Sequence, residues 1–361
     1  MKLITAIAFL GAFWVNAQIT SIPDLNFEQK LIDLNLDTII DGSVLTANIS
    51  NVTSLDINSS NISDLTGIED FSSITQLWCH QNQLTSLDIT QNSQLTELRC
   101  SFNQLINPDF SQNSALISLK CGFNQIISLD VSQNTLLELL WCTDNQLTSI
   151  DVSTNILLTN LQCSSNVLET LDISQNSALL VLSCYSNQLS ILDISNNLML
   201  EYIFCNINKL SVLDVSQQSS LLQLECPNNF LTSLDVSANP VLTELICSYN
   251  ELTCLNVKNG NNNNVLDFNA SNNPNLSCIE VDNVAYSNTY WSAAVGAIDP
   301  TMSFSTDCNT NCSADLTELN TTPKLLAKIV DLMGRETEEK PNTVLIYIYS
   351  DGTTEKVFKV E

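Results

Sequence analysis

Nine cysteines recur at a fixed interval along the chain and are the most regular candidates for chemistry in it. They are Cys79, Cys100, Cys121, Cys142, Cys163, Cys184, Cys205, Cys226 and Cys247. Thiols stacked about 4.8 Å apart, the spacing of neighbouring strands, could cooperate in binding a soft metal or in redox chemistry. Each cysteine, however, alternates with variable residues and takes an apolar position, so we interpret it as a small buried hydrophobe.

A second periodic set consists of aspartates, which could gather Ca²⁺ because this ion prefers oxygen ligands. The set is Asp88, Asp109, Asp130, Asp151, Asp172, Asp193, Asp214 and Asp235. Ser or Thr usually follows two residues later, a pattern typical of a repeated Asx turn in which the aspartate bonds its own backbone. We therefore expect a structural role, and a calcium-dependent structural layer stays as an alternative.

Catalytic chemistry has little support. The only histidine, His80, follows Cys79 directly, and the alternation that buries Cys79 turns His80 to the other face, so the two cannot form a catalytic dyad. Zinc-protease, nucleophile-elbow and phosphate-loop motifs are absent from the sequence. The ladder aspartates share one environment, whereas a glycosidase acid pair needs two different ones. We expect no catalytic residue, no metal and no cofactor.

The charge and the N-terminal residues bear on partners and compartment. The formal net charge is −27, which disfavours nucleic acid and anionic lipid as partners. Residues 1–17 combine Lys2, an apolar run and small residues before Ala17, the pattern of a secretory signal peptide. No later segment approaches the roughly 18 apolar residues that suggest a transmembrane helix. We expect export to an oxidising space.

Four further cysteines break the 21-residue period near the end of the array. They are Cys254, Cys278, Cys308 and Cys312. In an oxidising compartment we expect one or two disulfides among them, with Cys278 to Cys308 as the first choice. Four cysteines allow three complete pairings, and the sequence does not choose between them.

The elements that position these residues follow from the repeat itself. In the copy at 95–105, LTELRCSFNQL, Leu98 and Cys100 alternate with polar residues, which predicts a short strand with one buried face. An asparagine ends each such strand, and its amide can bond the backbone of its own and the neighbouring coil. This structural ladder is Asn82, Asn103, Asn124, Asn145, Asn166, Asn187, Asn208, Asn229 and Asn250. The later L-D-V segment predicts a second narrow strand or a turn on the convex side.

The pattern L-x-x-L-x-C-x-x-N-x-L resembles the leucine-rich repeat, with cysteine in one of the leucine positions. The resemblance implies a leucine-rich repeat solenoid, a β-rich right-handed coil with a parallel concave sheet. Residues 55–76 resemble the 22-residue internalin-type repeat, and residues 77–267 form nine copies of about 21 residues. A degenerate copy and a C-terminal cap follow at 268–313.

Both ends of the array carry different sequence. We expect a small helical cap within 18–54, opened by Asp24 or Asn26. Its apolar stripe consists of Phe27, Leu31, Ile32 and Leu34. Residues 314–361 contain three strand-like pieces, IVDL, VLIYIY and EKVFKV, with a hairpin turn at 351–352. This small β tail is similar to the C-terminal sorting domain of proteins exported by the type IX secretion system of Bacteroidetes, which implies delivery across the outer membrane and removal of the tail.

The residues on either side of each ladder cysteine are expected to face the concave surface. One column of that surface reads Trp78, Arg99, Lys120, Trp141, Gln162, Ser183, Phe204, Glu225 and Ile246. Aromatic residues and Arg are typical anchors of recognition surfaces, although exposed aromatics could also merely cover the sheet. The candidate ligand-binding residues are Trp78, Arg99, Lys120, Trp141, Tyr185, Tyr202 and Phe204.

These observations favour a non-catalytic binding or adhesion protein, secreted or displayed on the outer surface of a Gram-negative bacterium. Its expected ligand is a protein or glycan bound on the concave face, which is the face that leucine-rich repeat proteins commonly use. The type IX secretion machinery is the other expected partner. A secreted hydrolase targeted by its repeats is the alternative from another class, but the segments between the caps and the tail leave no room for a catalytic domain.

Overall fold

Short parallel strands, one in each coil, form the main sheet of the array. In this computed structural model the described residues are 18–308 and 312, with 326–330, 335, 337, 344–349 and 354–358 nearer the C-terminus. The chain separates into two units, Met1–Ala314 and Asp315–Glu361. The signal-peptide prediction falls on residues outside the described part.

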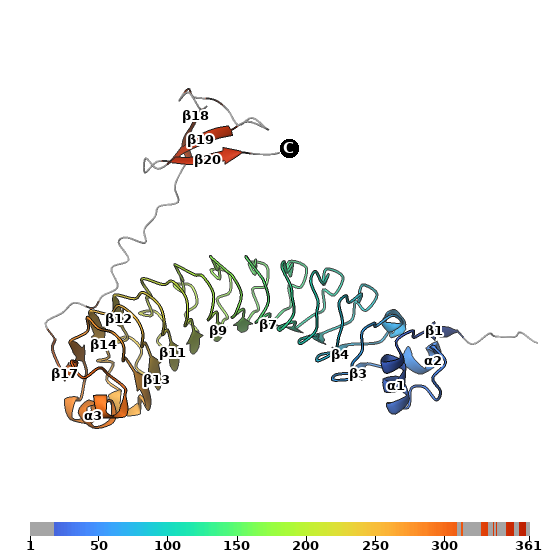
Figure 1. Cartoon of the computed structure of the whole chain (residues 1–361), viewed down its shortest axis with the longest axis horizontal. Helices are drawn as coiled ribbons and strands as arrows, with labels where there is room; N and C mark the ends of the chain where they lie inside the picture. The colour runs from blue at the N-terminus through green and yellow to red at the C-terminus, as the bar shows by residue number, and fades with distance from the viewer. Residues whose placement is uncertain are drawn as a thin grey trace, which may run out of the picture. The chain divides into compact units, whose positions relative to one another are not determined.

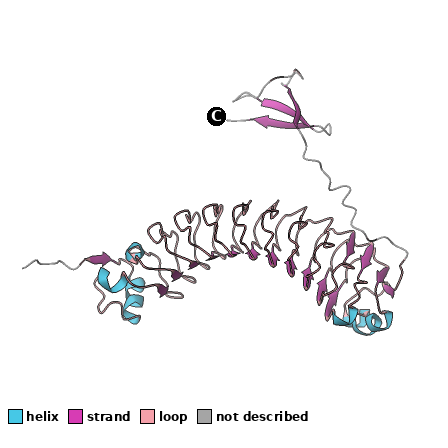
Figure 2. Cartoon of the chain, turned by 180° about the vertical axis from the view of Figure 1, so that it is seen from behind, coloured by secondary structure: helices cyan, strands magenta, loops and turns pink. Residues whose placement is uncertain are grey.

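Eleven strands of the first unit pair in parallel in a single sheet, mostly in the order of the sequence. They are β3 (Ser54–Asp56), β4 (Gln76–Trp78), β5 (Glu97–Arg99), β6 (Ser118–Lys120), β7 (Leu139–Trp141), β8 (Asn160–Gln162), β9 (Val181–Ser183), β10 (Tyr202–Phe204), β11 (Gln223–Glu225), β13 (Glu244–Ile246) and β15 (Asp267–Asn269). The strands line the inner side of a curved solenoid and the connecting turns lie on the outer side (Figures 1 and 2). This is the leucine-rich repeat solenoid with a parallel concave sheet that the sequence predicts.

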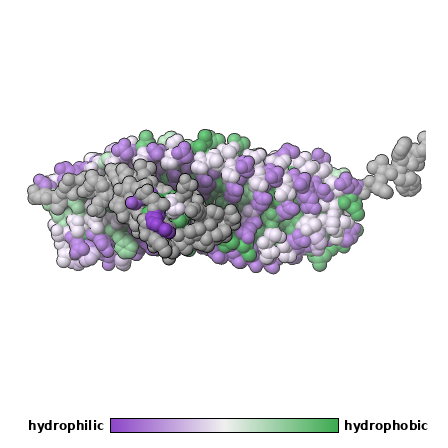
Figure 3. All heavy atoms as spheres, turned by 90° about the horizontal axis from the view of Figure 1, so that it is seen from above, coloured by the Kyte–Doolittle hydropathy of each residue, from purple (hydrophilic) through white to green (hydrophobic). Residues whose placement is uncertain are grey.

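The core is a continuous row of inward side chains. The middle residue of each strand of this sheet is buried, and so is the residue directly after the strand, which is a ladder cysteine from β4 to β13; Leu98 and Cys100, for example, have no exposed surface. All nine ladder cysteines are free thiols in this buried row. Viewed from above the arc in Figure 1, apolar residues on the outer surface are interspersed with polar ones (Figure 3).

The first asparagine ladder links each coil to the preceding one. Asn103 donates Nδ2 to the carbonyl oxygens of Cys79 at 3.0 Å and Cys100 at 3.1 Å. Its Oδ1 accepts from the backbone N–H of Leu84 at 3.0 Å. The same pattern recurs along the array, so a single amide satisfies backbone groups of two coils that would otherwise be unpaired.

A second amide ladder, which the sequence analysis did not identify, lies 10 residues after the first. It consists of Asn92, Asn113, Asn134, Asn155, Asn176, Asn197, Gln218 and Asn239. Asn155 donates Nδ2 to the carbonyl oxygens of Val131 and Asn134 at 3.0 and 2.9 Å. The Oδ1 atom is buried and has no partner among the described residues. The first ladder uses both ends of each amide, whereas the second uses only the donor.

The convex segments are turns along most of the array. The expected second strand occurs only toward the C-terminal end, where β12 (Ser233–Asp235), β14 (Cys254–Asn256), β16 (Cys278–Glu280) and β17 (Ser303–Ser305) form a parallel four-stranded sheet. In the earlier coils the same segment is taken up by Asx turns, since each aspartate accepts from the backbone N–H two residues later.

The N-terminal cap consists of β1 (Ile19–Ser21), α1 (Leu25–Asp33), β2 (Ser43–Leu45) and α2 (Thr46–Ile49). Asp24 caps α1, and Phe27 and Leu31 are fully buried against the first coils. The expected stripe is wrong at Leu34, which is 39% exposed because the helix ends before it. A short 3-10 helix, η1 (Ile68–Asp70), belongs to the first coil.

The C-terminal cap is closed by aromatic packing and two disulfides. It contains η2 (Asn262–Asn264), α3 (Val284–Tyr290) and η3 (Ala293–Val295). Trp291 is almost fully buried, stacks on Phe268 at 4.3 Å and donates Nε1 to the carbonyl of Val265.

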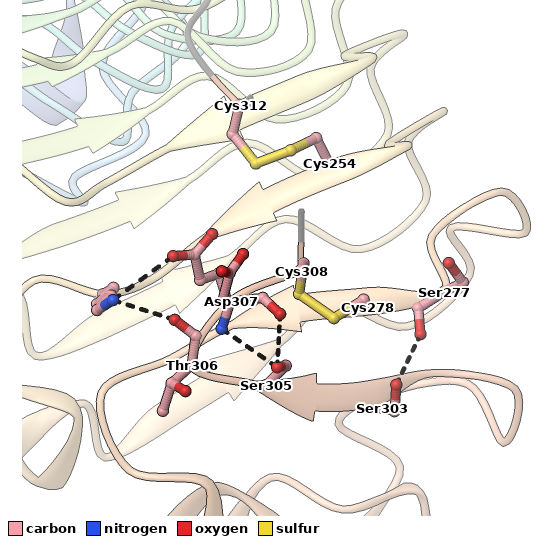
Figure 4. The surroundings of a disulfide bond; sticks show 11 residues. Cys254, Ser277, Cys278, Ser303, Ser305, Thr306, Asp307, Cys308 and Cys312 are labelled. Carbon is pink, nitrogen blue, oxygen red and sulfur yellow. Dashed lines mark hydrogen bonds and ion pairs between the residues drawn. A yellow bond between two sulfur atoms is a disulfide. The ribbon is translucent and has the colours of Figure 1, made fainter. Parts of the chain in front are cut away.

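The disulfides tie the end of the cap to the second sheet. They join Cys254 to Cys312 and Cys278 to Cys308 (Figure 4). The expected pairing of Cys278 with Cys308 is confirmed, and the structure selects one of the three complete pairings that the sequence left open.

The second unit contains a three-stranded antiparallel sheet of β18 (Leu326–Val330), β19 (Val344–Tyr349) and β20 (Thr354–Phe358). The strands overlap the three pieces read from the sequence, with β18 beginning earlier than IVDL. The expected turn at 351–352 lies outside the described residues. Within the part of the chain that the structure describes, no helix has the length and apolar character needed to cross a membrane.

Candidate functional site

The outward positions of the sheet form columns whose members are neighbours in space. Residues of one column pair in strict register from strand to strand, for example Trp78 with Arg99, Arg99 with Lys120, and Lys120 with Trp141. Register continues through β8, β9, β10 and β11 to Glu225 and Ile246. Because every coil repeats the same buried core, this exposed surface is where one coil differs from the next.

The N-terminal end of the column holds a fixed cation. The Arg99 guanidinium lies over the Trp78 ring, 4.7 Å from its centroid. Arg99 Nε also donates to Glu97 Oε1 at 2.6 Å. These two contacts hold the planar group in place, and its terminal N–H groups make no hydrogen bond to another described residue. Lys120, on the next strand, forms no ion pair within the described part of the chain.

An aromatic cluster stands beside these cations. Phe102 and Phe123 stack with ring centroids 4.2 Å apart, and both meet the Trp141 ring edge-on at 6.5 and 6.0 Å. Phe102 is 42% exposed and Trp141 is half-buried. A β-carbon on Gly122 would come within 2.8 Å of the Thr143 carbonyl and 3.2 Å of Trp141 Nε1, so a larger residue there would clash with the backbone of the next coil and press on the tryptophan.

The second aromatic group is separate from the first. Tyr202 and Phe204 lie on β10, and Tyr185 follows β9; all three are half-buried. Three strand steps, roughly 14 Å, separate β7 from β10, and Gln162 and Ser183 occupy the column between them. The predicted apolar residues Trp141 and Phe204 therefore belong to one surface but do not form one cluster.

The C-terminal end of the sheet is acidic. Glu225, Glu244 and Asp267 lie on the successive strands β11, β13 and β15, and Glu244 pairs in register with Asp267. Burial raises the pKa of Glu244, and the neighbouring charges of Glu225 and Asp267 raise it further. No Lys or Arg of the described residues forms an ion pair with these carboxylates.

His80 and Cys79 point to opposite sides, as the alternation requires. Cys79 is fully buried, and desolvation raises its pKa to about 12, so it is a neutral thiol. His80 is half-buried on the concave side. Burial lowers its pKa, Arg99 and Lys120 lower it further, and Asp56 acts in the opposite direction. A neutral thiol and a neutral imidazole on opposite faces do not make a nucleophile with its base.

The ladder aspartates are used by the backbone. Asp130 accepts from the Ser132 N–H at 2.9 Å, and hydrogen bonds from Ser132 hold the pKa of Asp130 below its ordinary value. Shallow grooves between the convex turns are lined by such residues, the one at Asp172 and Asp193 measuring about 490 Å³. No group of three or more His, Cys, Asp or Glu in the described residues is placed to hold a metal ion.

Sequence reasoning missed two features of this surface. Phe102 and Phe123 take a left-handed backbone position two residues after the ladder cysteine, outside the strand columns that the alternation predicts. The phenylalanine at the same position of CSFN and CGFN, in consecutive coils, was the available signal. The acidic end was missed because Glu244 and Asp267 belong to the other outward column of the strands.

Comparison with known proteins finds structures with a similar fold, one of which includes a cysteine ladder. No protein-family model and no curated protein matches the chain. Among solved structures, the functional domain of InlJ from Listeria monocytogenes, which includes a cysteine ladder, is 34% identical with a TM-score of 0.60. The match covers 73% of this chain and 66% of that one, so this chain spans slightly less than two thirds of it.

Two more distant structures share the fold. The internalin InlF of Listeria monocytogenes is 17% identical with a TM-score of 0.60, over 78% of this chain and 95% of that one. The leucine-rich repeat protein LIC12759 of Leptospira interrogans is 20% identical with a TM-score of 0.51, over 72% and 73%. The structural neighbours are thus leucine-rich repeat proteins, internalins among them.

Proposed function

We propose that this leucine-rich repeat solenoid is an extracellular, non-catalytic binding module that recognises a protein or glycan through its concave sheet. The observation that carries the proposal is the outward column from Trp78 to Glu225, whose side chains vary while the core beneath them repeats. Aromatic residues and Arg gather there, and such residues anchor recognition surfaces because they bury large areas at low entropic cost.

The fold leaves this surface rigid. The strands are held by the backbone ladder and by the first asparagine ladder, so the backbone positions that carry the outward side chains are fixed relative to one another before a ligand arrives. The Arg99 guanidinium is further held by Trp78 and Glu97. A preorganised surface loses little entropy on binding, which supports recognition of a large ligand.

Export and attachment belong to the same proposal. The two disulfides are what an oxidising compartment favours, and they support an extracellular location. The C-terminal unit would serve as a type IX sorting signal, used at the outer membrane of a Gram-negative bacterium and removed there. Mass spectrometry of the native exported protein tests this part, and an exported product that still ends at Glu361 would contradict removal of the tail.

Binding is tested with a glycan and protein array probed by the repeats. The array signals of the variant Trp141→Ala/Phe204→Ala are expected to be at least about tenfold weaker than those of the wild type. Its melting temperature is expected to change little, since both side chains are half-buried and lie outside the core. The matched control is Ile156→Ala/Leu198→Ala, which removes two exposed apolar side chains outside the strands of the sheet. Equal loss in the control, or none in the first variant, would place the site elsewhere.

A further inference from the structure

The concave sheet is electrically polarised along its length. Arg99 and Lys120 are two of the four Lys and Arg residues between positions 77 and 258, and they lie side by side on β5 and β6. Of these two cations, only Arg99 forms an ion pair with another described residue, which is Glu97. In a chain of net charge −27, these two cations on adjacent strands are a local concentration of positive charge, one of them paired with Glu97.

The opposite sign gathers at the other end of the same sheet. Glu225 accepts a hydrogen bond from Gln223 at 2.8 Å, and Glu244 and Asp267 follow on the next two strands. No Lys or Arg of the described residues forms an ion pair with these three carboxylates. Glu244 and Asp267 pair in register on adjacent strands, and burial together with the charges of Glu225 and Asp267 raises the pKa of Glu244.

Apolar and neutral residues separate the two charged ends, and the distance between the ends follows from the number of strands. Five strand steps lead from β6 to β11, which is about 24 Å at 4.8 Å a step. Trp141, Tyr202 and Phe204 lie between the ends, together with Gln162 and Ser183. An extended polypeptide covers that distance with about seven residues at 3.3 Å each.

We infer that the ligand of this surface is a polypeptide segment lying across the strands, with acidic side chains over Arg99 and Lys120, apolar side chains over Trp141 and Phe204, and basic side chains over Glu225 and Glu244. This inference rests on the proposed function and adds the chemistry and orientation of the partner. A polypeptide can carry both signs of charge and apolar groups in one extended strand. An acidic glycan matches the first end and is repelled by the second.

A peptide-display library of random 12-residue sequences tests the inference directly. Selection on the wild-type repeats is expected to enrich sequences with an acidic group and a basic group separated by about seven residues, in one chain direction. Selection on Arg99→Glu/Lys120→Glu is expected to lose the acidic preference and keep the basic one. Selection on Glu225→Lys/Glu244→Lys is expected to do the reverse.

Synthetic peptides from the selection supply the affinities. Moving the two charged groups of one peptide to adjacent positions, at unchanged composition, is expected to weaken binding at least about tenfold. If a charge-reversal variant has a lowered melting temperature, the neutral variants Arg99→Gln/Lys120→Gln and Glu225→Gln/Glu244→Gln replace it in the binding measurement. Each neutral variant is expected to bind the peptide selected on the wild-type repeats more weakly, and the affinity should depend less on salt concentration.

Three results would overturn the inference. Enriched sequences of one charge sign would do so, as would affinity that ignores the spacing of the charges, or binding of oligogalacturonate that needs Arg99 and Lys120 alone. The last result would leave the proposed function intact and make the ligand an acidic glycan. Peptides that bind equally well to wild type, to all charge variants and to Trp141→Ala/Phe204→Ala would instead contradict the proposed function itself.

Discussion

The carboxylate of Asp24 joins the N-terminal helix to the repeat array through Ser63. Its Oδ1 accepts from the N–H groups of Asn26 and Phe27 at the start of α1, at 2.9 and 3.0 Å. Its Oδ2 accepts from both the N–H and the hydroxyl of Ser63 at 2.8 Å. One side chain therefore caps the helix and attaches it to the first coil.

Replacing Asp24 with Asn separates these two roles. Asn caps a helix about as well as Asp, but its amide nitrogen cannot accept from Ser63, so the change is expected to cost about 1–3 kcal/mol of unfolding free energy. Burial by itself raises the pKa of Asp24, but the hydrogen bonds from Ser63 and its neighbours outweigh it and hold the pKa below 3.8.

The pH dependence of that variant follows from the lowered pKa. The contribution of Asp24 is fully present above pH 3.8 and is lost as the pH falls through the lowered value, so wild type and variant should converge in acid. Denaturant unfolding at pH 7 and pH 3 measures the difference. The control Ser63→Ala removes only the hydroxyl donor, and a larger loss from it than from Asp24→Asn would contradict this account.

The ladder residues of one coil are expected to differ in importance. Cys163→Ala exchanges one small buried group for another at a modest cost. Asn166→Leu removes the acceptor of the Leu147 N–H and the donor to the Cys142 and Cys163 carbonyls, and each unpaired group costs about 1–3 kcal/mol. Thermal melting of the two variants compares them. Equal melting temperatures would contradict the view that the asparagine is structural and the cysteine fills space.

The nine ladder thiols are expected to be unreactive in the folded protein. Each is fully buried, and desolvation raises the pKa of Cys163 to about 12, so almost no thiolate is present at pH 8. A thiol reagent should detect none of them in the native protein and all nine after unfolding in denaturant. Peptide mapping without reduction should recover Cys254 with Cys312 and Cys278 with Cys308. Rapid labelling of a native ladder thiol would show that the coils open.

Neutralising Glu244 is expected to stabilise the protein near pH 7. Its raised pKa means that the protonated form is favoured by folding, and this contribution is complete below pH 4.5 and lost as the pH rises through the raised value. In Glu244→Gln the side chain is neutral at every pH. The variant is therefore expected to be more stable than the wild type at pH 7 by about 0.2–1 kcal/mol, the range for charged neighbours on adjacent strands. Melting at pH 4 and pH 7 tests this, with the exposed Glu138→Gln as control. A gain of the same size at both pH values would count against it.

The 21-residue period was enough to predict the solenoid, because a pattern that buries Leu98 and Cys100 on one side leaves the coils no way to cover their cores except by stacking. The first outward column was readable for the same reason. The second amide ladder could not be predicted, since an asparagine in a turn looks the same in sequence whether it is exposed or buried. Phe102 and Phe123 were missed because the left-handed backbone turns them beside Trp141, a direction that strand alternation does not predict.

Because each ladder amide bonds only its own coil and the one before it, a whole coil can be inserted or deleted without leaving a backbone group unpaired. Recombination between identical positions of two coils therefore changes the length of the protein and keeps the hydrogen bonds of every coil. Each added coil between β6 and β11 would also move the two charged ends apart by about 4.8 Å. Unequal crossing-over in the gene would in this way alter the span of the surface in fixed steps, so related strains can be expected to differ in coil number before they differ in core sequence.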